Sequence, residues 1–179
     1  KVLRKFNNFK KITQCRLCNS KKIKQVYNFG LIPIGNNLQK SRLQSLLCQR
    51  YPLSLMLCST CGHFQLSISV NPKILYAKNY TYLTGVTKTF NKHFSDYSKW
   101  IIKKCKIKKN SLILDVGSND GTCLNHFKKN KMRVIGVDPA KKPCEIANSS
   151  GINTINSFFN KKTASKIKKK YGQLDFITS

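Results

Sequence analysis

Residues 111–140, SLILDVGSNDGTCLNHFKKNKMRVIGVDPA, decide the fold of the second half of the chain. They begin with a short apolar run, residues 112–114, of the kind that forms a buried parallel strand. A glycine-containing loop follows, and then Cys123, Leu124 and Phe127 recur at helical spacing. A second apolar run, residues 134–137, ends on Asp138. This order predicts one strand–loop–helix–strand unit of a doubly wound α/β sheet.

The loop after the first strand indicates which ligand this unit would bind. Its pattern is D-x-G-x-x-x-G, in which Gly117 and Gly121 let the backbone turn sharply and approach a ligand. A dinucleotide site would have G-x-G-x-x-G and would hold a pyrophosphate, which Asp115 and Asp120 would repel. The carboxylates suit S-adenosylmethionine, which carries an ammonium and a sulfonium, and Asp138 could accept hydrogen bonds from its ribose hydroxyls. The alternative is an ordinary strand-to-helix turn.

The alternation of helix and strand patterns continues beyond this unit. Residues 141–149 and 161–170 have helical patterns, whereas residues 152–155 and 174–177 resemble short strands. The sequence therefore predicts a partial, four-stranded Rossmann-like sheet.

The charge of the chain is extreme, with 34 Lys and Arg against six Asp and Glu among 179 residues, a net charge of +28. Only five of the basic residues are Arg, and the Lys residues are scattered among Asn. Phosphate and base recognition favours Arg, so we interpret the excess as a compositional bias rather than a nucleic-acid interface. Three of the six acidic residues lie in the loop and strand end described above: Asp115, Asp120 and Asp138.

Features of membrane insertion or secretion are not evident. No apolar run approaches the roughly 20 residues of a membrane span, and no apolar segment near the start resembles a signal peptide. We therefore expect a cytoplasmic location. The chain begins with Lys1 rather than Met, so an upstream segment could be missing.

Four of the eight cysteines form two C-x2-C pairs, Cys15 with Cys18 and Cys58 with Cys61. Two such pairs supply the four thiolates of a tetrahedral, structural zinc site. A redox C-x-x-C motif is the alternative, but it would explain one pair and not two. Another alternative is that His63 replaces a cysteine ligand, although four cysteines suffice.

The residues around the second cysteine pair have a β pattern. Apolar residues alternate at positions 53, 55 and 57 and again at 64, 66, 68 and 70, which predicts a hairpin with the metal at its tip. Asn19 and Gly62 follow the two pairs, and both residue types tolerate the left-handed backbone that directs amides at sulfur. Gly and Pro within residues 28–38 predict loops.

A tyrosine-rich segment and a helix lie between the two halves. Tyr76, Tyr80 and Tyr82 cluster in a loop-like stretch, where they could line a polar pocket or pack in a core. Apolar residues then recur every three or four positions from 86 to 101, which predicts an amphipathic helix of about 18 residues bridging the zinc module and the sheet. We interpret His93 as a packed or exposed histidine of this helix rather than a catalytic one.

Taken together, these motifs resemble the N-terminal part of the sugar C-methyltransferases, which methylate nucleotide-linked 4-keto deoxysugars with S-adenosylmethionine. The resemblance covers nearly the whole chain. The matching segments are Cys15-Arg16-Leu17-Cys18, Gly30 with Pro33 and Asn36, Tyr51-Pro52-Leu53, Cys58-Ser59-Thr60-Cys61-Gly62, Gln65-Leu66, Tyr80-Thr81-Tyr82, His93, Asp115-Val116-Gly117-Ser118-Asn119-Asp120-Gly121, Gly136-Val137-Asp138-Pro139-Ala140 and Phe158-Phe159. The family commonly has Glu where Asp115 and Asp138 stand.

The resemblance implies an α/β fold with a zinc-ribbon-like β module (residues 1–70), a tyrosine-rich segment with a bridging helix (71–110) and a partial Rossmann-like class I methyltransferase sheet (111–179). It implies a nucleotide-linked sugar as substrate, no nucleic-acid or membrane partner, and an unspecified oligomeric state. The implied metal ligands are Cys15, Cys18, Cys58 and Cys61; the implied sugar-binding residues are Tyr76, Tyr80 and Tyr82; the implied cofactor-binding residues are Asp115, Gly117, Asn119, Gly121, Asp138, Pro139 and Phe158.

The family reaction is methylation of a carbanion. A base removes the proton at carbon 3, which the neighbouring keto group acidifies, and the enolate attacks the sulfonium methyl. The family has a C-terminal domain and a catalytic histidine beyond the fourth strand, so we expect the catalytic residues beyond Ser179 and an inactive chain in their absence. Two alternatives remain, a zinc-containing RNA methyltransferase and a non-catalytic protein that binds the cofactor only.

Overall fold

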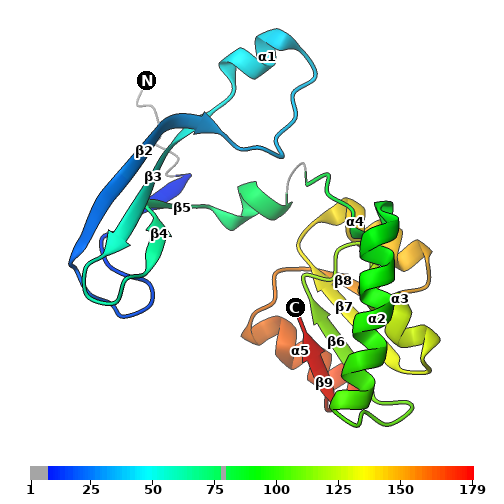
Figure 1. Ribbon diagram of the computed structural model, residues 1–179. Helices are drawn as coiled ribbons and strands as arrows, with labels where there is room; N and C mark the ends of the chain where they lie inside the picture. Colours follow the sequence, from blue (N-terminus) through cyan, green and yellow to red (C-terminus); the bar gives the residue numbers. More distant parts are fainter. Residues whose placement is uncertain (1–7, 78–79) are drawn as a thin grey trace. The chain divides into compact units, whose positions relative to one another are not determined.

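A computed structural model describes residues 8–77 and 80–179 (Figure 1). The chain divides into two compact units, Lys1–Asn79 and Tyr80–Ser179. Each unit has its own strands and helices and is described by itself.

The first unit is built from short antiparallel strands. β2 (Ile23–Pro33), β3 (Arg50–Cys58) and β4 (Phe64–Leu66) form a three-stranded sheet in the order β2-β3-β4. β1 (Phe9–Lys11) pairs with β5 (Ile68–Val70) in a separate two-stranded sheet. The short helix α1 (Arg42–Leu47) lies between β2 and β3, and a π-helical turn, η1 (Lys73–Ala77), follows β5.

The predicted hairpin around the second cysteine pair is confirmed, because β3 and β4 pair antiparallel from Leu55↔Leu66 to Leu57↔Phe64. Gln65 is the buried residue of β4, whereas Phe64 and Leu66 are exposed. The Gln65 side chain accepts a hydrogen bond from the backbone N–H of Arg16 at 2.8 Å and donates one to the carbonyl of Gln14 at 3.0 Å. These bonds fasten the first cysteine turn to the hairpin.

The prediction of loops throughout residues 28–38 is wrong, because β2 continues to Pro33. The ladder with β3 shifts register twice, between Gln25 and Tyr27 and between Asn28 and Gly30. Gly30 has a φ of +78°, a left-handed conformation that suits glycine, and such bulges keep a strand paired where a glycine interrupts it. The Pro at the end is tolerated because β2 is an edge strand.

The second unit is a parallel α/β sheet covered by helices. After the 3-10 turn η2 (Thr84–Val86) and the helix α2 (Lys88–Lys104), strands and helices alternate along the chain. The elements are β6 (Leu112–Val116), α3 (Thr122–Lys129), β7 (Arg133–Asp138), α4 (Lys141–Ser149), β8 (Thr154–Asn156), α5 (Lys161–Tyr171) and β9 (Phe176–Thr178). The strand order β8-β7-β6-β9 reverses direction at β6, which is the topological switch point of the sheet.

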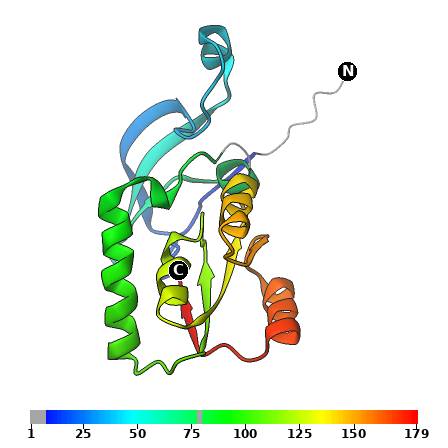
Figure 2. The same ribbon diagram turned by 90° about the vertical axis from the view of Figure 1, so that its right-hand side faces the viewer.

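Both faces of this sheet are buried, which explains the continuous apolar runs of its strands. On one face Ile113 of β6 packs with Phe127 of α3 and Ile101 of α2. On the other face Leu112 and Leu114 pack with Ile167 of α5. Figure 2 shows α2 and α5 on opposite sides of the sheet. Within residues 8–77 and 80–179, no helix combines the length and apolarity needed to cross a membrane.

The predicted strand at residues 152–155 is displaced toward the C-terminus, because β8 covers Thr154–Asn156. Ile152 is buried in the core, but its N–H bonds to the carbonyl of Ala147 and so closes α4 instead of joining the sheet. The hydrophobicity of Ile152 therefore predicts its burial in the core, whereas the pairing of β8 with β7 begins two residues later, at Thr154.

Candidate metal centre and cofactor site

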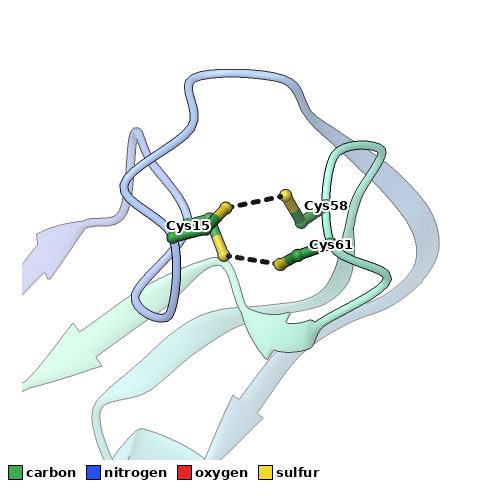
Figure 3. Close-up of side chains that lie close together, drawn as sticks. Cys15, Cys58 and Cys61 are labelled. Carbon is green, nitrogen blue, oxygen red and sulfur yellow. Dashed lines mark hydrogen bonds between the residues drawn. The ribbon is translucent and has the colours of Figure 1, made fainter.

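The four paired cysteines converge at one end of the first unit. One ligand atom from each of Cys15, Cys18, Cys58 and Cys61 lies within 4.8 Å of all the others. The sulfurs of Cys15 and Cys61 are 3.7 Å apart, as are those of Cys18 and Cys58, and Figure 3 shows Cys15, Cys58 and Cys61 facing one another. A tetrahedral zinc with bonds of about 2.3 Å would place its sulfurs roughly 3.8 Å apart. The geometry therefore fits a closed, four-thiolate zinc site.

Two turns of the same shape present these cysteines. The N–H of Asn19 bonds to the carbonyl of Cys15, and the N–H of Gly62 bonds to the carbonyl of Cys58, both at 2.9 Å. Asn19 has a φ of +59° and Gly62 a φ of +74°, as the sequence predicted for the residues after each pair. A hydrogen bond from the backbone of Cys18 lowers the pKa of the Cys15 thiol, which favours the thiolate that binds metal.

His63 lies next to this cluster but is not part of it. Its carbonyl accepts a hydrogen bond from the N–H of Cys58 at 2.9 Å, so it closes the second turn through its backbone. Among the described residues, the group of ligands close enough to share a metal consists of four cysteines. The alternative of a histidine ligand is not needed.

The loop after β6 in the second unit is fastened by Asp138. One carboxylate oxygen accepts the N–H of Asn119 at 2.9 Å, and the other accepts the N–H of Ala140 at 2.8 Å. The N–H of Gly117 bonds to the carbonyl of Val137 at 2.8 Å. Asp138 is 5% exposed, and each of its oxygens keeps a further lone pair that a ribose hydroxyl could use.

Asp115 is the unusual residue of the site. It lies at the carboxyl end of β6 and is 7% exposed. Burial, and then the nearby charge of Asp138, raises the pKa of Asp115 to about 7. Buried carboxylates are normally compensated by a cation or by donors, so the position suits a ligand that brings a positive charge.

A pocket of about 280 Å³ opens beside Asp115 at the switch point. Gly117 and Ser118 of the loop line it, together with Thr178 of β9. Among the described residues, no ion pair gives Asp115 a cation. A buried acid at the wall of a pocket, with no cation beside it, fits a ligand that carries a positive charge.

Asn119 and Asp120 face a different neighbour, residues 82–85, which we name the docking segment. The Asp120 carboxylate accepts the N–H of Gly85 at 2.7 Å and both the N–H and hydroxyl of Thr122, so it caps α3 rather than lining the pocket beside Asp115. The Asn119 amide accepts the N–H of Thr84 and donates to the carbonyl of Tyr82, both at 3.0 Å. The interpretation of Asp120 as a ligand-facing acid is replaced by this structural role.

The predicted tyrosines fall in two units. The docking segment brings Tyr82 to the loop after β6, and the ring of Tyr80 meets that of Tyr82 edge-on at 6.4 Å. Tyr76 belongs to the first unit, where it lines a pocket of about 680 Å³ together with Arg16 and His63.

The remaining predicted cofactor residues lie in the loops that follow three adjacent strands, β6, β7 and β8. Gly121, with a φ of +78°, is the residue before α3, and a Cβ there would lie 3.0 Å from Ile152. Pro139 follows Asp138 directly after β7, and Phe158 lies two residues after β8. The Phe158 carbonyl accepts the Thr163 hydroxyl at 3.0 Å, which fixes the backbone of the loop before α5.

Two residues that sequence reasoning did not assign to the site also line the pocket beside Asp115. His93 and Tyr97 lie one turn apart on α2. The Tyr97 hydroxyl hydrogen-bonds to the Thr178 hydroxyl at 2.9 Å. Their four-residue spacing, which places both on one helix face, was the available signal. The contact of this face with the last strand, which the sequence did predict, was not identifiable from the sequence.

Comparison with known protein families gives a match for the part of the chain that contains both cysteine pairs. Residues 15–76 match a family model described as "Putative zinc binding domain". These residues form a zinc-binding domain. The match includes both cysteine pairs, and it agrees with the four-sulfur geometry, so the zinc prediction is confirmed.

The zinc-binding domain and the second unit align together with the C-methyltransferase NovU of Streptomyces niveus. The identity is 26% over 161 residues, which covers 90% of this chain and 38% of NovU. The chain resembles a C-methyltransferase and spans 38% of the length of this relative.

Among solved structures, two of the plantazolicin methyltransferase BpumL are similar to part of the chain. One is the complex with SAH, at 23% identity and a TM-score of 0.31, covering 40% of this chain and 30% of BpumL. The other is the complex with SAH and a monoazolic desmethylPZN analogue, at 23% identity and a TM-score of 0.30, covering 38% and 28%.

Proposed function

We propose that the chain binds S-adenosylmethionine in its second unit and takes part in C-methylation of a nucleotide-linked 4-keto deoxysugar. The main observation behind this proposal is that Asp115 and Asp138 are both buried at the carboxyl ends of the paired strands β6 and β7. The same chain has a zinc-binding domain. The similarity to a C-methyltransferase over both parts supports this proposal.

Each end of the cofactor would meet a different part of the site. Asp138 would accept hydrogen bonds from the ribose hydroxyls, and Asp115 would pair with the ammonium of the methionine part. Gly117, with a φ of +82°, would allow close backbone approach. Pro139 and Phe158, at the ends of neighbouring strands, would provide apolar contact for the adenine. The bound cofactor supplies a methyl group activated by its sulfonium.

The sugar would lie against the docking segment. Asn119 and Asp120 hold this segment by three hydrogen bonds to Tyr82, Thr84 and Gly85, so the segment has a fixed position beside the loop. Phenolic hydroxyls at Tyr80 and Tyr82 could donate to the sugar oxygen that gains negative charge when the neighbouring carbon loses its proton. Tyr76, which the sequence also predicts as a sugar-binding residue, lies in the first unit and stays a prediction.

Cofactor binding is tested by calorimetry with S-adenosylhomocysteine and, in parallel, NAD. We expect binding of the former only. Asp138→Ala removes a charged acceptor and should weaken binding about 10- to 150-fold, equivalent to about 1.5–3 kcal/mol. Equal affinity of the variant and the natural chain would contradict the assignment of Asp138.

The reaction is tested with methyl-labelled S-adenosylmethionine and three acceptors: a nucleotide-linked 4-keto-6-deoxyhexose, its 4-hydroxy analogue, and transfer RNA. The protein as expressed from its gene is assayed beside the 179-residue chain. We expect label only in the keto sugar, because only the keto group acidifies the neighbouring carbon. Label in the RNA would instead make the +28 charge functional and would overturn the proposed substrate.

A further inference from the structure

His93 lies at the pocket beside Asp115 although it belongs to α2, which is outside the strand–loop–helix unit. The residues that line this pocket include an acid, Asp115, and a base, His93. His93 itself is exposed, and packing of the core does not explain its place there.

The imidazole is held in place by aromatic rings of its own helix. It stacks on Tyr97, with ring centroids 6.4 Å apart and planes at 15°, and it meets Phe94 edge-on at 5.3 Å. Tyr97 is in turn fixed by its hydrogen bond to Thr178 and by an edge contact with the buried Phe127 at 6.1 Å. An exposed side chain held by such contacts loses little further freedom when it binds a ligand.

An acid and a base on the walls of one pocket match the two charges of an amino acid. Asp115 suits the ammonium, and an imidazole can donate an N–H to a carboxylate in its neutral and its protonated form. Building on the proposed function, we infer that His93 recognises the α-carboxylate of the cofactor's methionine part, with Tyr97 as the residue that positions it.

Three ligands separate this role from a general effect on the site. S-adenosylhomocysteine has the ammonium and the carboxylate, decarboxylated S-adenosylhomocysteine has only the ammonium, and 5′-methylthioadenosine has neither; all three are thioethers without a sulfonium charge. His93→Ala should weaken binding of S-adenosylhomocysteine about 10- to 100-fold and leave the other two affinities within about twofold. Asp115→Asn should weaken the binding of the two ligands that have the ammonium and leave the affinity for 5′-methylthioadenosine unchanged.

Two further variants serve as controls. His93→Gln keeps an N–H donor and should recover part of the affinity for S-adenosylhomocysteine. His126→Ala removes a histidine that bonds to Asn91 on the surface, and it should change none of the affinities.

The outcomes separate this inference from the proposed function. Unchanged binding of S-adenosylhomocysteine by His93→Ala, or an equal loss for all three ligands, would overturn the inference and leave the cofactor site intact. Failure of the natural chain to bind any of the three would overturn the proposed function and the inference together.

Discussion

At the scale of single residues, the ionisation of Asp115 should affect both the stability of the second unit and its affinity for the cofactor. Its pKa of about 7, raised by burial and then by the charge of Asp138, means that the folded protein resists ionising this group. The unfolded chain ionises it near the ordinary value of 3.8. A proton bound more tightly in the folded state stabilises the fold at acid pH, and this contribution is lost as the pH rises from about 4 to about 7.

Asp115→Asn should therefore stabilise the second unit above about pH 7. The amide removes the buried charge, and the gain should reach about 2–4 kcal/mol. Urea unfolding at pH 8 and at pH 4 measures the free energy of unfolding. We expect the variant and the natural chain to differ in it at pH 8 and not at pH 4. Asp120→Asn is the control, because that carboxylate accepts backbone N–H groups of Gly85 and Thr122 and its replacement by an amide should not stabilise the fold.

The same group should make cofactor binding depend on pH. If ionised Asp115 pairs with the ligand's ammonium, the affinity for S-adenosylhomocysteine rises about tenfold per pH unit up to about pH 7 and is level above it. Calorimetry between about pH 5.5 and pH 8 would show this. The affinity for 5′-methylthioadenosine, which lacks the ammonium, should not change with pH. If the affinities for both ligands changed equally with pH, the titrating group would not be Asp115.

At the scale of the elements, the sequence predicted what local patterns determine. The bounds of α4 and the strand–loop–helix–strand order of β6, α3 and β7 follow from hydrophobic spacing and a glycine turn, and all are observed. Contacts between distant segments were not predictable in this way. The docking segment meets the loop through Asn119 and Asp120, and β2 crosses a glycine only because β3 supplies its hydrogen bonds.

The docking segment depends on the absence of a side chain at Gly85. A Cβ there would lie 2.6 Å from the Thr122 hydroxyl and 3.1 Å from the Asp120 carboxylate. Gly85→Ala should push the segment off the loop, costing about 1–3 kcal/mol, and hydrogen exchange of residues 82–86 should accelerate. Gly35→Ala, where a Cβ has no neighbour within 4 Å, is the control. Unchanged exchange in Gly85→Ala would mean that the segment is not held by these contacts.

At the scale of the whole molecule, two separate cores imply two separate responses to metal removal. Because structural zinc binding is coupled to folding, a chelator should unfold residues before about Val70 first, while the parallel sheet of the second unit persists. Hydrogen exchange followed along the chain distinguishes the two units. Simultaneous loss of protection in both would contradict independent cores.

The zinc stoichiometry provides a matched pair of variants. The natural chain should carry about one zinc. Cys58→Ser should lose it, because a ligand of the cluster is removed, whereas Cys48→Ser should retain it, because Cys48 is outside the cluster. Metal analysis of the purified variants measures this, and the reverse result would refute the assignment.

The strand order of the parallel sheet also determines the sequence of assembly during synthesis. β6 and β7 pair across a short connection, from Leu112↔Arg133 to Val116↔Val137, so this ladder can close as soon as β7 has left the ribosome. β9 pairs with the opposite edge of β6, from Ile113↔Phe176 to Asp115↔Thr178, and exists only after every other described element has been made. The pocket at the switch point has Thr178 in its wall, so this wall forms later than those made by the loop after β6 and by α2, and it depends on a non-local strand.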